Sequence, residues 1–473
     1  MMFLNDYTTY LDSEIDSAAV FNRKYRVALQ ALSGLDLHKV TQDDESNVLV
    51  LPYALDSSLQ DSDEWVLWDY SEYTKNGQTH QELRTRNLVG FIGHNNTNIA
   101  IGSRFSSKQN NNISTDYFLL YLLQKTLGIS LFESLKSNSG NNLESALDFL
   151  LLLFPAIFKK ALSQGMFKQY VRRSYNDANI RGVIDVPRHI RYNIPANGKV
   201  AYNTREFSYD NPITQLIRHT IEYLRRHKFG KSLLTGDAVM RSFVQQIIQA
   251  TPSYVANQRQ QIIVQNLRPI AHPLYTQYAM LQQLCVRILR YEKISYSDKE
   301  SNKIHGVLID MNWLWEEYVA QILSEKTSLG HYTRKNAFNL LKKEDGEQFQ
   351  KVIPDYFGVH EGENIVADAK YMFLNNSDQL KVEKAMAVYY KTIMYMYRFN
   401  SKTGLLLYPY KPQSENSENE IAVVKYDIVE TDGKIYKIGL RIPQNDSLTD
   451  FVLQIQIEED KFAKTVSQRS GPT

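Results

Sequence analysis

The sequence predicts a multidomain α+β protein with a β-rich N-terminal module, a mainly helical middle, and a C-terminal α/β domain built on a mixed central sheet. The chain has 473 residues, too many for one ordinary core, and its hydrophobic content of 43% supports a folded protein. Its hydrophobic periodicity also changes twice, from strand-like to helical and then to an alternation of both. We therefore expect domains at residues 1–115, 116–300 and 301–473.

The N-terminal region is predicted to form short strands between turns. The strand segments are NVLVLPYAL, EWVLWDY, NLVGFIG and NIAIGSRF, and HNNT separates the last two. The polar, Asn-rich stretch Ser106–Ser114 has no apolar period and is predicted to be a linker or loop.

The middle region is predicted to be helical in two parts. Apolar residues recur at intervals of three and four in DYFLLYLLQKTLG and LESALDFLLLLF, and helices resume from Pro212 to about Tyr291. Between these parts, the stretch that follows Tyr175 contains Pro187 and Pro195, and we expect strands and loops there rather than helix.

From Ile304 helices and strands alternate. The expected helices are DMNWLWEEYVAQILSE and KVEKAMAVYYKTIMYMYRF, and the expected strands are KVIPDYFGV, NIVADAKYMF, GLLLYPY, IAVVKYDIV and KIYKIGLRI. The polar stretch Pro412–Glu420 is predicted to be a surface loop and the tail VSQRSGPT to be disordered.

Composition excludes several classes of protein. The single cysteine, Cys285, permits no intrachain disulfide and no cysteine cluster for zinc or iron–sulfur. The N-terminus lacks the pattern of a signal peptide. The longest apolar stretch, Leu147–Phe158, falls short of the ~20 residues that a membrane helix needs. We therefore expect a cytoplasmic protein with no membrane segment.

Two carboxylates and a lysine form the candidate catalytic set. Asp355 follows Pro354 at the end of a short apolar strand, and Asp368 and Lys370 lie in a second apolar run about a hairpin's length later. Because strand side chains alternate, Asp368 and Lys370 point to one face while Ala369 turns to the core. Carboxylates suit Mg²⁺, which neutralises charge on a phosphate and lowers the pKa of an attacking water. We predict that Asp355, Asp368 and the Ala369 carbonyl hold Mg²⁺ for phosphodiester hydrolysis, and that Lys370 positions the water.

The alternative interpretation of this motif is structural. A Pro-Asp step often makes a turn, Asp-Ala-Lys is an ordinary strand edge, and so short a motif arises by chance. The neighbouring residues favour a site, because VIPDYF and NIVADAKYMF surround the carboxylates with apolar side chains. An unpaired charge there would be costly unless it met a cation.

These residues resemble the PD-(D/E)xK nuclease superfamily and, more closely, the McrC-type subunit of the modification-dependent McrBC restriction systems. The resemblance covers most of the chain. Glu316, in WLWEEYV, matches the family's Leu-aromatic-Glu helix, which implies an additional site acid; the alternative is a solvated helix acid. Tyr395 matches the tyrosine of the helix after the site, but Lys391 replaces the family's glutamine and is either a phosphate contact or a surface lysine.

Two upstream segments extend the resemblance. The stretch FKQYVRRSYNDANIRGVIDV is similar to the family's segment around Arg-Gly-x-Ile-Asp, which implies that these residues hold the middle domain together. The stretch NLVGFIGHNNTNIAIGSRFSS resembles the small β module found in multi-subunit Type II restriction systems of the BsuMI or LlaJI kind.

The resemblance also implies a partner, an AAA+ NTPase related to McrB that hydrolyses GTP or another nucleotide and moves along DNA while this subunit cuts. The chain itself has no phosphate-binding loop of its own, because Arg225 stands where the first glycine before Gly230-Lys231-Ser232 would be needed. Residues 1–100 hold 7 Lys/Arg and 15 Asp/Glu, so this acidic module is expected to dock the NTPase or to be a plain small β domain. A cytosine methyltransferase in the same system would indicate self-protecting restriction, and the sequence leaves open whether methylated DNA is cut.

A basic stretch in the middle region is a candidate surface for double-stranded DNA. Residues 151–230 hold 14 Lys/Arg and 5 Asp/Glu, with tyrosines between the cations. The alternative is a solvated charged face. The predicted contacts are Arg172, Arg173, Arg181, Arg188 and Arg191.

Two functions therefore stand. The first is the catalytic endonuclease subunit of an NTP-dependent restriction complex that defends against foreign DNA. The second is a non-catalytic DNA-binding or assembly subunit of the same kind of complex. The set of Asp355, Asp368 and Lys370 favours the first.

Overall fold

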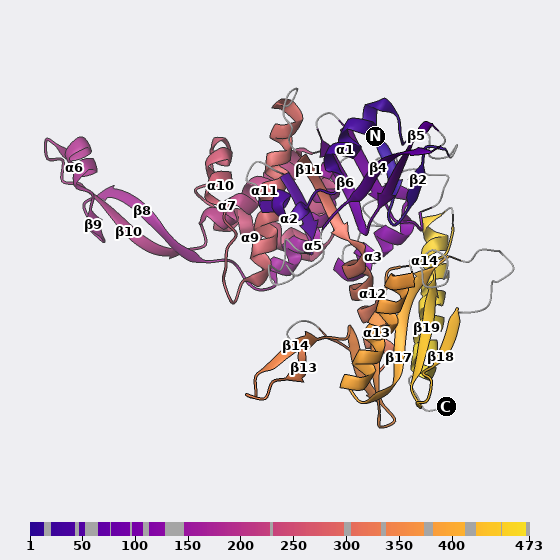
Figure 1. The fold of residues 1–473 in the computed structure, drawn as a ribbon. Coiled ribbons are helices and arrows are strands. Elements are labelled where there is room, and N and C mark those ends of the chain that lie inside the picture. The colour runs from indigo at the N-terminus through magenta and orange to yellow at the C-terminus, as the bar shows by residue number, and fades with distance from the viewer. Residues whose placement is uncertain are drawn as a thin grey trace.

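The computed structural model shows a mixed α/β protein with several sheets, as the sequence predicts at that level (Figure 1). It describes the chain except for residues 14–19, 43–46, 53–64, 76, 95–96, 107–112, 128–145, 228–229, 298–303, 333–336, 373–381, 412–421, 446 and 470–473. The predicted surface loop at 412–420 and most of the predicted linker at 106–114 lie outside the described residues.

A five-stranded sheet of order β1-β7-β6-β11-β3 forms the core of the N-terminal module. Its strands are β1 (Met2–Asn5), β3 (Asn47–Leu51), β6 (Leu88–His94), β7 (Thr97–Gly102) and β11 (Ile304–Asp310). The antiparallel β6–β7 pair is the expected hairpin. The strand β11 comes from beyond residue 300 yet lies between β6 and β3, so the boundary expected at 301 cuts through this sheet. Its residues are buried on both faces, a pattern that local sequence cannot assign to one sheet or another.

A small second sheet and two helices complete this module. The sheet has the order β2-β5-β4, from β2 (Thr9–Leu11), β4 (Trp68–Lys75) and β5 (Gln78–Thr85), and the helices are α1 (Arg23–Leu32) and α2 (Leu37–Gln42). Neither helix was among the expected elements. Trp68 joins the helix to the sheet, because its indole N–H donates to the Leu29 carbonyl at 2.9 Å.

The middle region is helical where the periodicity predicts helices. Its helices are η3 (Ile113–Thr115), α3 (Tyr117–Leu127), α5 (Ala146–Leu162), α7 (Pro212–Arg226), α8 (Gly230–Thr235), α9 (Ala238–Ala250), η4 (Ala256–Gln258), α10 (Arg259–Gln265) and α11 (Thr276–Ser297). Cys285 lies in α11 and is buried. A Cβ at Gly230 would lie 2.3 Å from the Leu224 carbonyl oxygen, so this glycine serves the close packing of α8 against the end of α7.

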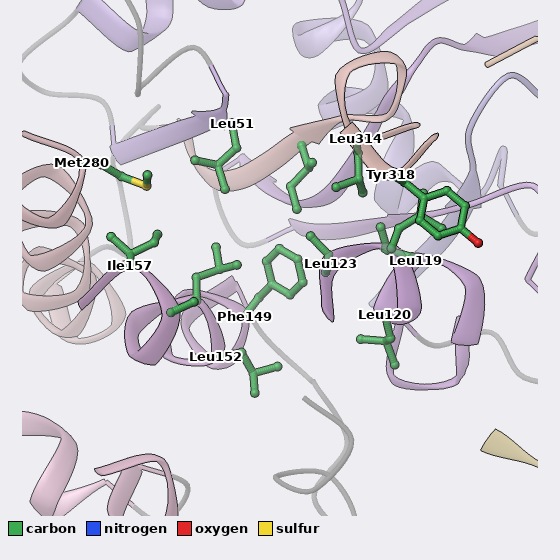
Figure 2. Close-up of a cluster of buried hydrophobic side chains, with 14 of the residues drawn as sticks. Leu51, Leu119, Leu120, Leu123, Phe149, Leu152, Ile157, Met280, Leu314 and Tyr318 are labelled. Atoms are coloured by element: carbon green, nitrogen blue, oxygen red, sulfur yellow. The ribbon is translucent and has the colours of Figure 1, made fainter. Parts of the chain in front are cut away.

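One apolar core joins these helices to the other regions (Figure 2). Leu51 from β3, Leu123 from α3, Phe149 from α5 and Met280 from α11 belong to it, together with Leu314 from the C-terminal region. The regions therefore pack on shared side chains. Among the described residues, no helix is both long and apolar enough to cross a membrane.

A β-arm projects from the helical region (Figure 1). It consists of β8 (Gln169–Asp177), β9 (Val183–Ile184), α6 (Val186–Asn193) and β10 (Val200–Ser208), with the sheet order β8-β10-β9. The expectation of strands and loops without helix was wrong for α6. Asp185 caps this helix by accepting from the Arg188 N–H, and Pro187 sits in the first turn, where no donor is needed.

The C-terminal region contains a six-stranded mixed sheet of order β12-β15-β16-β17-β19-β18. Its strands are β12 (Gly330–His331), β15 (Tyr356–His360), β16 (Glu363–Ala369), β17 (Ser401–Tyr410), β18 (Val423–Asp427) and β19 (Lys434–Arg441), and β13 (Phe338–Lys342) pairs with β14 (Gln348–Val352) in a separate hairpin. The strands β16, β17 and β19 are parallel, and the outer pairs are antiparallel.

Helices cover both faces of this sheet. They are α12 (Met311–Lys326), α13 (Val382–Arg398) and α14 (Leu448–Arg469). Val366 and Leu406 share a core with Met396 of α13, whereas Ile365 and Leu405 belong to the core that holds α12 and α14. Alternate residues of β16 and β17 thus pack against opposite layers.

Two expectations for this region were wrong. Asp355 does not end a strand but directly precedes β15. The final helix α14 was not expected, and the predicted disordered tail is helical as far as Arg469. The tail was predicted to be disordered because its composition is polar. Its one apolar side chain in the helix, Val466, is fully buried with Phe462 in the core and anchors the last turns.

Candidate active site

The ends of β15 and β16 bring the two predicted aspartates together. The strands pair antiparallel with Tyr356 opposite Ala367, so Asp355, just before β15, lies beside Asp368. The Asp355 carboxylate accepts a 2.7 Å hydrogen bond from the Ala369 N–H through its Oδ2. The backbone of one predicted site residue thereby fixes the side chain of another.

Lys370 completes this cluster. Its ammonium forms an ion pair with Asp368, whose side chain is only 1% exposed. Its backbone N–H donates to the Leu407 carbonyl at 2.7 Å, and the Trp315 indole donates to the same oxygen at 3.2 Å. The lysine is therefore held at both its backbone and its side chain.

The pKa values of the two aspartates shift in opposite directions. Burial raises the pKa of Asp355 well above its usual range, and repulsion from Asp368 and Glu316 adds to the rise. Burial also acts to raise the pKa of Asp368, but the cations Lys370 and Lys391 outweigh it and hold that pKa below its usual value. The two carboxylates thus compete for positive charge, and Lys370 forms its ion pair with Asp368.

This arrangement fits a hard divalent cation. A cation between Asp355 and Asp368 would replace their repulsion by attraction, and oxygen ligands suit Mg²⁺. Within the described part of the chain, no three His, Cys, Asp or Glu residues gather as a ready-made metal cage. Such a cation would therefore need a backbone oxygen or waters besides the two aspartates, which is usual for Mg²⁺. The Ala369 carbonyl stays a predicted ligand.

Glu316 belongs to the same neighbourhood. It lies on α12, and its negative charge raises the pKa of Asp355. Its Oε1 lies 2.9 Å from Nε2 of His331, and its backbone carbonyl accepts from the Tyr356 hydroxyl at 2.5 Å. With 32% of its side chain exposed, Glu316 is an oriented acid at the edge of the site rather than a freely solvated one.

The helix α13 adds a second cation. Lys391 Nζ lies 4.0 Å from Oδ1 of Asp368 and 5.4 Å from the centre of the Tyr395 ring. Tyr395 is buried, whereas the Lys391 side chain is 44% exposed. Where the resemblance implies glutamine, this chain places an ammonium that contacts the cluster and still reaches solvent.

A comparison with protein families agrees with the resemblance found in the sequence. A family model described as the McrBC 5-methylcytosine restriction system component matches residues 83–409. The chain belongs to this McrBC family. The match includes the arm and every one of the predicted site residues.

Solved McrBC assemblies are also similar. A chain of the half-complex from a tetradecameric assembly of Thermococcus gammatolerans McrB AAA+ hexamers with bound McrC aligns over 98% of this chain and 99% of its own, with 14% identity and a TM-score of 0.47. A chain of the Thermococcus gammatolerans McrBC complex aligns over 69% of this chain and 87% of its own, with 14% identity and a TM-score of 0.34. No curated protein matches the chain.

The five predicted DNA-contacting arginines of this McrBC-family chain all lie on the arm, which projects away from the C-terminal sheet (Figure 1). Arg173 pairs with Asp210 at 3.1 Å, Arg181 with Asp177 at 3.5 Å, and Arg188 with Asp185 at 3.7 Å. These three cations have local partners. A cavity of about 740 Å³ lies along the arm and is lined by Tyr170, Arg172, Val183, Ile184, Asp185, Val186, Pro187, Asn203, Thr204 and Arg205.

The resemblance implied that Arg181, Gly182, Ile184 and Asp185 hold the middle domain together, and in the structure the contacts of Arg181, Gly182 and Asp185 lie within the arm. The Arg181 Nε donates to the Tyr202 hydroxyl at 3.1 Å, and Asp185 accepts from the Asn203 side chain at 3.0 Å. A Cβ at Gly182 would lie 2.2 Å from the Asn203 carbonyl oxygen. They hold β9 and α6 against β10 within the arm.

Sequence reasoning missed His331. Burial acts to lower its pKa, but the hydrogen bond and charge of Glu316 outweigh burial and raise it. The residue lies at the edge of the sheet on β12, which pairs with β15. No local pattern marks a lone histidine whose partner lies on the preceding helix, so only the packing of β12 beside α12 reveals it.

Proposed function

We propose that this chain is the catalytic subunit of an McrBC-type restriction system, a Mg²⁺-dependent endonuclease that cuts double-stranded DNA in defence against foreign DNA. The observation that carries the proposal is the convergence of Asp355, Asp368 and Lys370 at the adjoining ends of β15 and β16, where the pKa values of the two carboxylates are driven apart. Perturbed acids with a specific charge partner are typical of active sites. We assign the C-terminal domain to the PD-(D/E)xK type on the same residues.

Each side chain has a role in this proposal. Asp355 and Asp368 would hold Mg²⁺, and a bound Mg²⁺ lowers the pKa of a water and neutralises phosphate charge. Lys370, fixed by Asp368 and Leu407, would orient the attacking water and stabilise the negative charge of the transition state. Glu316, held by His331 near Asp355, would accept a proton, and the half-exposed Lys391 would contact a phosphate oxygen.

The proposal includes an AAA+ NTPase partner related to McrB. The family to which the chain belongs is a restriction-system component, and the Thermococcus structures pair McrC with McrB AAA+ hexamers. Gly230 opens the short helix α8, and Arg225 stands where the first glycine of a phosphate-binding loop would be needed. The energy for movement along DNA would therefore come from the partner, which we expect to dock on the acidic N-terminal module.

The basic arm supplies a second, weaker proposal for DNA contact. Arg172 and Arg191 lie on β8 and α6, where the arm projects from the body of the molecule (Figure 1). Phosphate contacts there would hold DNA without reading its sequence.

A cytosine methyltransferase in the same system would protect host DNA. A comparison of cutting of methylated and unmethylated duplexes would show which of the two is attacked.

The decisive experiment uses the purified chain with its McrB-like partner, nucleotide, Mg²⁺ and duplex DNA. We expect Asp355→Ala and Lys370→Ala each to lower the cutting rate by about 100-fold or more, as loss of a group that stabilises transition-state charge does. The matched control is Asp427→Ala, which removes an exposed carboxylate on β18 of the same sheet. Chelation of Mg²⁺ should stop cutting and its return should restore it.

The same experiment separates the two candidate functions. Variants that still assemble with the partner but no longer cut support the catalytic subunit. If both variants cut as well as the wild type, the chain is instead a non-catalytic DNA-binding or assembly subunit.

A further inference from the structure

The residue that follows Lys370 is buried against the N-terminal module. Tyr371 is 2% exposed, and its ring lies 6.0 Å from the Tyr7 ring and 6.2 Å from the Phe105 ring. The guanidinium carbon of Arg104 lies 4.2 Å from the centre of the same ring. The N-terminal module therefore reaches within one residue of the candidate catalytic lysine.

Asp6 fixes the backbone of Arg104 and lies near its guanidinium. Its backbone N–H donates to Oδ1 of Asp6 at 2.7 Å, and the Asp6 N–H donates to the Gly102 carbonyl at 2.9 Å. Asp6 is fully buried, and its carboxylate offers the guanidinium a negative charge nearby. The guanidinium also lies 5.0 Å from the Phe105 ring and 5.3 Å from the Tyr7 ring. A cation among three aromatic rings and shielded from water is attracted to their faces more strongly than an exposed one.

Lys370 thus lies between two anchors. On one side its backbone N–H is bonded to Leu407 of β17, and on the other the next side chain is gripped by Arg104. Its ammonium must meet Asp368 from this backbone position. A displacement of about 1 Å at a reacting group can cost a large factor in rate. The contact of Arg104 with Tyr371 therefore affects the rate by fixing the position of Lys370.

We propose that Arg104 is a positioning residue for the nuclease site, acting through Tyr371 to fix Lys370. This inference rests on the proposed nuclease function. It assigns to the N-terminal module a role beyond partner docking, because this module supplies Arg104, which contacts Tyr371. Arg104 does not touch the reacting atoms, and its effect is on the rate of the chemical step rather than on DNA binding.

The test compares Arg104→Met and Arg104→Lys in the complex with partner, nucleotide, Mg²⁺ and DNA. Methionine removes the charge but keeps an apolar chain of similar reach, whereas lysine keeps a cation over the ring. We expect Arg104→Met to lower kcat about 10-fold with KM within about twofold of wild type, as loss of a supporting residue does, and Arg104→Lys to recover most of it.

The matched control is Arg218→Met. Arg218 is also a mostly buried arginine over a tyrosine, with its guanidinium carbon 4.9 Å from the Tyr254 ring, but it lies in the helical middle. We expect this control to leave kcat unchanged at a similar loss of thermal stability. An equal loss of kcat in the control, an unchanged kcat in Arg104→Met, or no recovery in Arg104→Lys would overturn the proposal.

Substitutions at Tyr371 give an independent measurement if Arg104→Met fails to fold. Tyr371→Phe keeps the ring face and should retain kcat, whereas Tyr371→Leu removes it and should lower kcat. Failure of the underlying function shows itself differently, because the wild-type complex would then not cut, or Asp355→Ala would cut equally well. If the wild type cuts and Tyr371→Leu cuts just as fast, only the proposed positioning of Lys370 by Arg104 and Tyr371 is refuted.

Discussion

The cluster at the ends of β15 and β16 and the projecting arm differ in how far their charges are exposed. In the cluster, Asp368 is 1% exposed and its partner Lys370 is 19% exposed. On the arm, the Arg181 and Asp177 side chains that pair are 54% and 41% exposed. Water and salt screen the second pair, whereas they have little access to the first.

This difference in exposure determines how much each group of charges affects the stability of the fold. Charges on the arm cost little to keep and contribute little to stability one by one. In the cluster, burial and the charges of Asp368 and Glu316 disfavour the charged form of Asp355 and raise its pKa, so that charge is retained at the expense of stability. The cations Lys370 and Lys391 instead favour the charged form of Asp368 and lower its pKa. Substitutions in the cluster should therefore change both activity and stability, and those on the arm should change salt dependence.

The largest effect is expected for Asp355→Asn. It should reduce cutting by ~10²–10³-fold, as loss of an electrostatic catalytic group does, yet raise the thermal unfolding temperature measured without divalent cations. The amide can still accept from the Ala369 N–H, while a carboxyl that burial, Asp368 and Glu316 disfavour in its charged form is gone.

The sign of its pH dependence follows from linkage. The folded-state pKa of Asp355 is raised, so its contribution to stability is full below the unfolded-state pKa and is lost as pH rises toward the folded-state pKa. The stability gained by Asp355→Asn should therefore grow as the pH is raised from 4 toward neutrality. Asp427→Asn is the control, and a lower unfolding temperature for Asp355→Asn than for this control would contradict the buried-charge argument.

The next effect concerns His331. We expect His331→Ala to lower the cutting rate about 10-fold, since Glu316 loses the hydrogen bond that orients it. His331→Gln, which can still donate, should recover part of the rate. His360→Ala at the other end of β15 serves as the comparison, and equal rates for the two alanine variants would remove His331 from the site.

A third prediction applies the same logic to the fully buried Asp116, whose pKa burial raises to about 7. The folded protein then holds a proton that the unfolded chain releases above pH 4, so stability falls as pH rises from about 4 to 7. Asp116→Asn should make this fall shallower by up to ~1.4 kcal/mol per pH unit. His219, with its pKa lowered to about 4 by burial, acts in the opposite sense below pH 6.5. His219 does so in both the wild type and Asp116→Asn. The free energy of unfolding should therefore be measured with denaturant across this pH range for both proteins, and the difference between them compared.

The smallest effect is expected on the arm. Arg172→Ala combined with Arg191→Ala should weaken DNA binding and reduce the slope of log affinity against log salt by about one for each phosphate interaction that the substitutions remove. Cutting at saturating DNA should stay unchanged. An unchanged slope would leave the arm with no phosphate contact at these two positions. Arg173→Ala is a useful contrast, because it removes the cation paired with the buried Asp210, leaves that carboxylate with its hydrogen bonds from Gln215 and Ser253, and should cost stability instead.

Much of the fold and the central site follow from local sequence. Apolar periodicity fixes which side of a helix or strand is buried, and this predicts α3, α5, α11 and the strands β15, β16, β17, β18 and β19 of the C-terminal sheet, but not its edge strand β12. Asp355, Asp368 and Lys370 could be grouped because one hairpin, β15–β16, holds all three. When the residues of a site are this close along the chain, pairing of two strands is enough to assemble it.

The tertiary structure decided the contacts between distant residues. Nothing in IHGVLID states that β11 joins β3 and β6, because a strand apolar on both faces fits any central position. The partnership of His331 with Glu316 depends on where β12 lies beside α12, and the grip of Arg104 on Tyr371 on how the N-terminal module packs against the end of β16. Periodicity fixes the face that a side chain occupies, whereas the packing of whole elements fixes what that face meets.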